Sequence, residues 1–226
     1  MSTPTPPATA QRLLDAAARL LSEEGPAALT TRRLAREVGA STMAVYTHFG
    51  SLAEVVRGVI HEGFRRLADR LRALPETDDP VADLATMCRE SLEYARAEPH
   101  LVAVMFGGTT LAGFELREDD LRIGGYALRI LRDLVARCMA AGRFRAGDPM
   151  MVTRHLWCQM HGLTQLERAG YFAPAFIPEG YPYLEGQLRD FAVGAGDTLE
   201  AATRSVEESV RRSGARLKRQ RNAGRG

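Results

Sequence analysis

Cysteine, lysine and long apolar runs are all scarce in this chain of 226 residues. The three cysteines, Cys88, Cys138 and Cys158, contain no CxxC pair, which argues against a disulfide framework or a structural zinc site and favours buried thiols. No segment has the roughly 18 uncharged apolar residues that a membrane helix needs, and no apolar run follows a basic start. We therefore expect a cytoplasmic protein that has no contact with a membrane.

Sequence motifs of enzymes are also missing. The chain has no HExxH, no GxSxG and no phosphate-cradling GxxxxGK, and His155 and His161 are six residues apart, so they lie on different faces of a helix. The sequence therefore predicts a protein that is not an enzyme and that uses no metal and no cofactor.

The residues that are present favour a globular helical protein. Apolar residues make up 45% of the chain and charged residues 26%, which is ordinary for a soluble domain. Leu13, Ala17, Leu20 and Leu21 share one face of a helix expected over 10–24, and later segments repeat this spacing. No strand-like alternation occurs. The predicted fold class is all-α.

Residues 30–49 predict a helix-turn-helix. Thr30 and Ser41 can cap two short helices, Gly39 can adopt the positive φ that the turn needs, and Val45 can plug the contact between the helices. The exposed side of the second helix would then present short polar and aromatic groups to the major groove of DNA. The alternative is a helical hairpin that only contributes to the core.

The segments from Glu24-Gly25 through His48-Phe49 resemble the DNA-binding domain of the TetR family of bacterial repressors, over about residues 10–57. The resemblance implies phosphate contacts from Tyr46 and His48, although packing of both against the first helix is the alternative. The family usually has a lysine where this chain has Leu52. Either Ser51 and the helix N-terminus replace that phosphate contact, or the affinity for DNA is lower and depends less on salt. The expected DNA-binding residues are Thr30, Thr31, Arg32, Ser41, Thr42, Met43, Tyr46, Thr47, His48 and Ser51.

A second resemblance lies at residues 156–163, which look like the WHG-type C-terminal effector domain of some members of this family. Trp157 and His161 are four residues apart, so their rings can stack or bracket a pocket, or they can simply pack in the core. Flexible methionine side chains suit an adaptable apolar cavity and suit ordinary core equally well. The expected ligand-binding residues are Met87, Met105, Phe106, Met139, Trp157, Met160 and His161.

The resemblance and the composition together give the expected domain order. It comprises a disordered arm (1–9), a three-helix DNA-binding domain (10–50), a connecting helix (51–73), an effector-binding and dimerisation bundle (81–212) and a basic disordered tail (213–226). Residues 211–226, which include this tail, carry seven basic and no acidic side chains, so a sequence-independent hold on DNA is the tail's functional alternative.

The expected function is that of a homodimeric transcriptional regulator. We expect it to be a repressor that leaves a pseudo-palindromic DNA operator when a small apolar or aromatic effector binds. Two alternatives remain open at this point. One is an activator of the same fold, and the other is a carrier of apolar small molecules that binds DNA incidentally.

Overall fold

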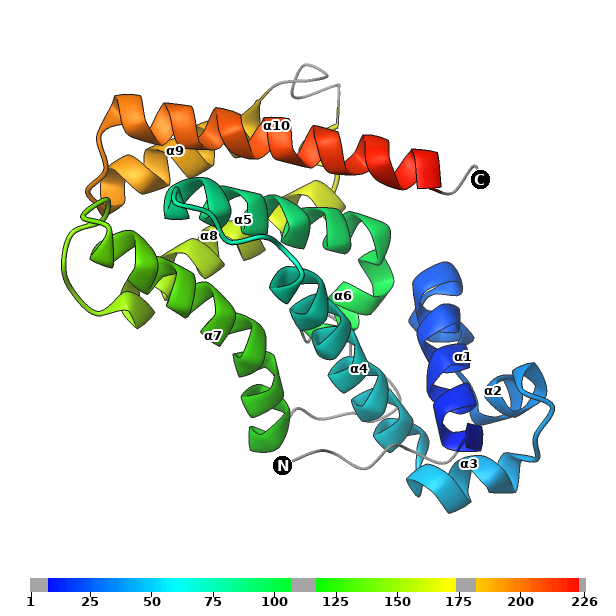
Figure 1. Cartoon of the computed structure of the whole chain (residues 1–226). Helices are drawn as coiled ribbons and strands as arrows, with labels where there is room; N and C mark the ends of the chain where they lie inside the picture. Colours follow the sequence, from blue (N-terminus) through cyan, green and yellow to red (C-terminus); the bar gives the residue numbers. More distant parts are fainter. Residues whose placement is uncertain (1–7, 107–116, 174–181, 224–226) are drawn as a thin grey trace. The chain divides into compact units, whose positions relative to one another are not determined.

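The computed structural model describes residues 8–106, 117–173 and 182–223, and every regular element in them is helical (Figure 1). The α-helices are α1 (Ala8–Glu24), α2 (Thr31–Glu37), α3 (Thr42–Phe49), α4 (Leu52–Arg72), α5 (Pro80–Ala97), α6 (Pro99–Met105), α7 (Glu118–Ala140), α8 (Pro149–Arg168), α9 (Tyr183–Ala195) and α10 (Leu199–Ala223); a 3₁₀ turn, η1, covers Pro26–Ala28. The all-α prediction is confirmed.

The chain divides into two compact units. The first comprises residues 1–67 and 96–126, and the second comprises residues 68–95 and 127–226. Three helices, α4, α5 and α7, continue from one unit into the other, because each of them includes a boundary residue. None of the described helices combines the length and the apolar character needed to cross a membrane.

Helices α1, α2 and α3 form the head of the first unit, residues 8–50, which corresponds to the predicted DNA-binding domain. Leu13, Leu20 and Leu21 of α1 are fully buried, as are Leu34 of α2 and Val45 of α3. These residues carry the apolar spacing seen in the sequence, so burial of this stripe explains why such short helices are stable here.

Helix α4 begins directly after the head. The Ser51 hydroxyl oxygen accepts a hydrogen bond from the Glu54 backbone N–H at 3.2 Å, which caps the helix. Farther along α4, Arg57 and His61 both contact Asp120 in the first turn of α7, at 2.9 Å each. The side chain of Asp120 is 2% exposed, and these partners offset the cost of burying its charge.

In the second unit, α9 packs on α10, and ion pairs join loops to helices. Arg143 donates to both oxygens of Asp197, at 2.9 and 2.6 Å, and it also donates to Asp79 and Ser205. Burial opposes ionisation of Asp79, but hydrogen bonds from Ser205 and the Ala82 N–H, together with Arg143, lower its pKa below the usual range. This cluster fixes the turn between α9 and α10.

Two expectations from the sequence are wrong. Helix α10 continues to Ala223, so the segment after residue 212 is helical and not a disordered tail; Arg216 pairs with Glu90 at 2.8 Å, and such pairs anchor the extra turns. Cys158 is exposed, whereas Cys88 and Cys138 are buried as expected. Most of the expected N-terminal arm, residues 1–7, lies outside the described residues.

Candidate DNA-binding surface

Helix α3, the predicted recognition helix, buries one residue and exposes most of the others. Val45 is fully buried and fills the contact with the other helices of the head, while Met43 is 68% and Tyr46 is 50% exposed. Thr42, Thr47 and His48 are exposed as well. Tyr46 and His48 therefore do not serve as core residues against α1, and the side chains predicted to read DNA share one accessible surface.

The predicted caps at the helix starts are present. Thr30 Oγ1 accepts from the Arg33 N–H, and Ser41 Oγ accepts from the Ala44 N–H, at 3.2 Å each. Both cap residues are exposed. Each hydroxyl therefore stabilises its helix and still has a hydrogen to donate to a phosphate oxygen.

The two neighbouring arginines at the start of α2 differ in availability. Arg33 donates to Glu37 at 2.8 Å and to Glu24 at 2.9 Å, so two carboxylates of the head already hold it. Hydrogen bonds from Arg19 and Arg33 lower the pKa of Glu37. Arg32 is exposed, and within the described part of the chain it has no ion-pair partner. Of the two, Arg32 is the arginine that can reach a phosphate.

The turn between α2 and α3 has a support that the sequence analysis missed. Gly39 has a φ of +64°, as the predicted turn requires. The guanidinium of Arg12, on α1, donates to the Val38 carbonyl at the end of α2. The side chain of Arg12 thus supplies the hydrogen bond that the Val38 carbonyl lacks within α2. Because the two residues are 26 positions apart, a local sequence pattern cannot predict this contact.

The predicted ligand-binding residues are divided between the two units. Met105 and Phe106 belong to the first unit, where Phe106 packs edge-on against Phe64 with ring centroids 5.5 Å apart. Met87 and Met160 are buried in the second unit, which also contains Met139, Trp157 and His161. The groove described below includes only Met139 of this set, and the role of the set in ligand binding stays a prediction.

Trp157 and His161 do lie against each other, with ring centroids 5.7 Å apart and planes inclined by 31°. The indole is 42% exposed, so the pair is not enclosed in the core. Burial lowers the pKa of His161, and the charge of Arg168 lowers it further, which favours the neutral imidazole at pH 7. The sequence predicted this ring contact correctly, but it could not tell that the indole lies at the surface.

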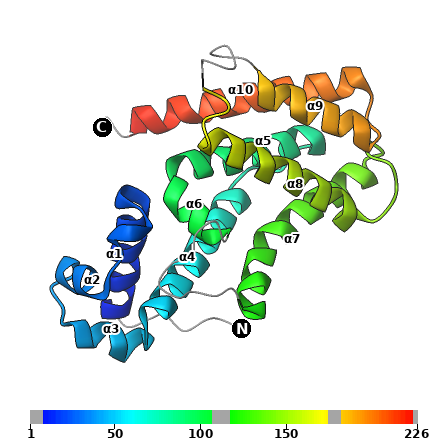
Figure 2. The ribbon, with the colours of Figure 1, turned by 180° about the vertical axis from the view of Figure 1, so that it is seen from behind.

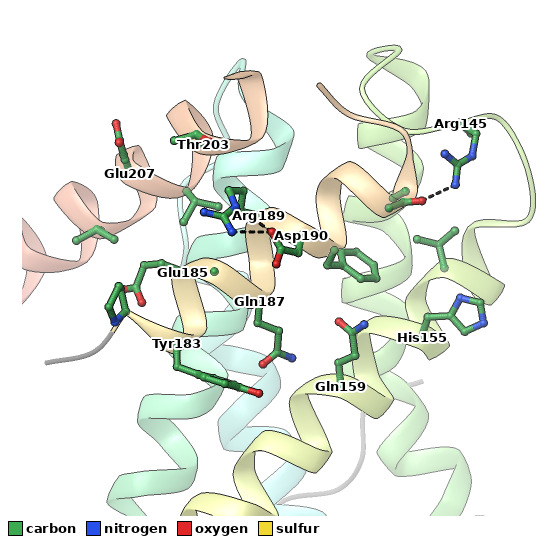
Figure 3. A pocket seen from close by; sticks show the side chains of 18 of the residues that line it. Arg145, His155, Gln159, Tyr183, Glu185, Gln187, Arg189, Asp190, Thr203 and Glu207 are labelled. Carbon is green, nitrogen blue, oxygen red and sulfur yellow. Dashed lines mark hydrogen bonds and ion pairs between the residues drawn. The ribbon is translucent and has the colours of Figure 1, made fainter. Parts of the chain in front are cut away.

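A groove of about 1160 Å³ lies in the second unit among α8, α9 and α10 (Figure 3). Its walls are residues at helical spacing: Val152, His155 and Gln159 from α8, Tyr183, Gly186, Gln187 and Asp190 from α9, and Thr203, Val206, Glu207 and Val210 from α10. Met139 is the one predicted ligand-binding residue among its walls. The side chains of Gln159, Gln187 and Tyr183 project into the groove (Figure 3). These walls are more polar than the predicted apolar pocket.

Comparison with family models accounts for both halves of this arrangement. Residues 13–59 match the model described as bacterial regulatory proteins of the TetR family, and residues 84–191 match a tetracycline repressor-like C-terminal domain. The chain belongs to the TetR family. This TetR-family protein is a DNA-binding regulator and not an enzyme. The second match includes Trp157, His161 and Gly162, the residues that suggested a WHG-type effector domain.

Curated relatives of the TetR-family protein include nucleoid occlusion factors SlmA. The factor of Aliivibrio fischeri is 34% identical over 109 residues, which cover 47% of this chain and 56% of the relative, so the chain spans only about half of that relative's length. The factor of Vibrio cholerae is 28% identical over 189 residues, covering 79% of this chain and 95% of the relative.

Solved structures show the same fold at low identity. A protein of unknown function from Rhodococcus sp. RHA1 superposes with a TM-score of 0.70 at 24% identity, covering 84% of this chain and 97% of that one. RolR, in complex with resorcinol, superposes with a TM-score of 0.64 at 16% identity, covering 88% and 92%. These likenesses establish the fold of the TetR-family protein and nothing finer.

Proposed function

We propose that this TetR-family regulator is a homodimeric repressor that binds a pseudo-palindromic operator and leaves it when a small apolar or aromatic effector binds. The observation that carries the proposal is the exposed face of α3, where Thr42, Met43 and Tyr46 stand clear of the core while Val45 anchors the helix. One recognition helix contacts only a few bases, so useful specificity needs two heads related by a two-fold axis.

The proposed dimer contact is made by α8 and α10. One face of α10 carries Leu199, Thr203, Val206 and Val210, and Leu199 and Val210 are 61% and 41% exposed. On α8, Met151 is 49% exposed. Apolar groups exposed along two helices favour a helical interface, and the groove of about 1160 Å³ among α8, α9 and α10 lies beside them. A second copy would cover these groups.

The proposed effector site is formed by the ring pair Trp157 and His161 together with the methionines of the second unit. The structural neighbour RolR binds resorcinol, which is an aromatic molecule of the proposed class. In the proposed mechanism, the effector shifts α4, which is continuous with the head, and so alters the spacing of the two recognition helices. A coupling of about 1–3 kcal/mol would lower operator affinity roughly 5- to 150-fold.

The test begins with the purified protein and a pool of random duplexes at 0.15 M salt, together with the region upstream of its own gene. Selection of a palindrome, bound much more tightly than random DNA, is the expected result. Binding that does not discriminate between duplexes would overturn the proposal. The operator complex is then titrated with resorcinol and with a panel of larger apolar aromatics, and release by at least one of them is expected.

Two rival functions predict different outcomes. For an activator, deletion of the gene lowers transcription from the operator, whereas deletion raises it for a repressor. For an apolar carrier, Tyr46→Ala leaves the biological role intact, whereas the regulator loses its role. We place the regulator in the cytoplasm, where its operator would be.

A second candidate function is nucleoid occlusion, favoured by relatives of that name at 34% identity. It is tested by deleting the gene and imaging septa and nucleoids together. Septa that form over nucleoids would support it, and septa placed as in the wild type would exclude it.

A further inference from the structure

At the C-terminal end of α1, the carbonyl of Ser22 lacks the backbone N–H donor that an α-helix would normally supply. In an α-helix the carbonyl of Ser22 would accept from the N–H four residues later, but that residue is Pro26, which has no N–H. The Gly25 N–H donates its hydrogen bond to the Leu21 carbonyl instead, at 3.2 Å. The chain around residue 25 therefore leaves the Ser22 carbonyl without its local partner.

The missing donor comes from α6, 78 residues later. His100 Nδ1 lies 2.7 Å from the Ser22 carbonyl oxygen, and because a carbonyl can only accept, this nitrogen carries the hydrogen. The other side of the ring lies over Gly25, where an added Cβ would be 3.7 Å from His100 Nε2. Gly25 has a φ of +81°, which a side chain would strain. The imidazole thus closes the end of α1.

A second bond reinforces the same place. The Ser22 hydroxyl donates to the carboxylate of Glu98, which is the N-cap residue of α6. Glu98 makes no side-chain cap bond to its own helix, so its carboxylate is used to bind α1 instead. Ser22, Glu98 and His100 together form the α1–α6 joint.

The opposite side of α6 is fitted to α4. A Cβ added to Gly63 of α4 would lie 2.7 Å from Met105 Sδ and 3.4 Å from Leu101 Cδ1, so the glycine makes room for α6. Phe64 and Phe106 make an edge-on contact beside it. In both ribbon views α6 lies beside α4 and near the end of α1 (Figures 1 and 2). Helix α6 therefore bridges the connecting helix and the first helix of the head.

We propose that the α1–α6 joint sets the orientation of the DNA-binding head relative to α4, and that His100 is a positioning residue for the spacing between operator half-sites. This inference rests on the proposed two-headed operator binding. In the proposed operator complex, His100 does not contact DNA. Its hydrogen bond restrains the head in addition to the contacts that α4 makes with it, which are the chain connection, packing and an exposed ion pair between Arg66 of α4 and Asp15 of α1 at 3.1 Å.

The test measures half-site spacing. Wild-type protein first selects a palindrome from random duplexes, and its affinity is then measured for probes with one or two base pairs added between the half-sites. Each added base pair moves a half-site by about 3.4 Å and turns it by about 35°. The readout is the ratio of affinities for the selected and the widened probes, with a single half-site probe as reference.

His100→Leu keeps apolar bulk over Gly25 and removes the donor, whereas His100→Asn places an amide N–H near the position of Nδ1. The Leu variant should lower the spacing ratio about tenfold and leave single half-site affinity unchanged, while the Asn variant should stay close to wild type. Ser22→Ala removes only the hydrogen bond to Glu98, so it should lower the spacing ratio by less than His100→Leu does. This variant also tests the inference if His100→Leu does not fold.

Three outcomes separate the claims. If wild-type protein selects no palindrome or shows no spacing preference, the proposed function fails and the inference fails with it. If wild-type protein prefers one spacing and both His100→Leu and Ser22→Ala keep that preference, only the inference fails. If the Asn variant loses the preference as fully as the Leu variant, the donated hydrogen bond is not what positions the head.

Discussion

Replacing Tyr46 by phenylalanine isolates one expected phosphate contact. The side chain is 50% exposed and its hydroxyl has no part in the described core, so the free energy of unfolding should change by less than about 0.5 kcal/mol. A hydrogen bond to a charged group contributes about 1.5–3 kcal/mol. At the lower figure, the two heads of a dimer together lose about 3 kcal/mol, which weakens operator binding roughly 150-fold.

Fluorescence anisotropy with the selected operator over a range of salt concentrations measures this effect. The phenol is neutral and releases no counterion, so the slope of log affinity against log salt should stay that of the wild type. Tyr171→Phe is the matched control, since Tyr171 is a tyrosine 61% exposed outside the head. Wild-type affinity of Tyr46→Phe, or an equal loss in the control, would refute the assignment of Tyr46 to the DNA surface.

Three further predictions concern charge, dimerisation and acid stability. Arg32→Gln should lower the salt slope of operator binding by about 1.8, one phosphate per head, whereas Arg33→Gln should change it less because two carboxylates hold Arg33; equal slopes would contradict this. Val210→Glu should produce monomers in sedimentation experiments, while Arg204→Glu, on another side of α10, should leave the wild-type state. Because the pKa of Asp79 is lowered on folding, its contribution to stability is present above about pH 4 and is lost as the pH falls further. The melting temperature of Asp79→Asn should therefore lie below that of the wild type at pH 7 and closer to it at pH 3. An equal difference in melting temperature at both pH values would show that Asp79 is not the source of this pH dependence.

Much of the DNA-binding surface could be predicted because its signals are local. Thr30, Ser41 and Gly39 act within a few residues of their own positions, and the caps and the positive φ appear where the sequence placed them. Val45 is buried since helical spacing fixes which face of α3 meets the core. The exposure of Tyr46 follows from the same geometry.

The predicted effector site shows where local spacing stops being informative. Trp157 and His161 approach each other because they are four residues apart, yet the exposure of the indole depends on what packs against α8. Likewise, the composition of the last 14 residues resembles a disordered tail, but ion pairs such as Arg216 with Glu90 hold α10 as a helix. Those partners lie more than 100 residues apart, beyond the reach of a sequence pattern.

The sequence by itself determined that the chain is helical, where its short helices begin and which face of α3 is free, because backbone capping and helical periodicity act over a few residues. Tertiary structure alone decided which arginine of the head stays available, which side chain closes α1 and where the groove lies. Arg33 is held by Glu24 and Glu37, and the Ser22 carbonyl is satisfied by His100. Such choices depend on which distant groups folding brings within hydrogen-bond distance, and only packing settles that.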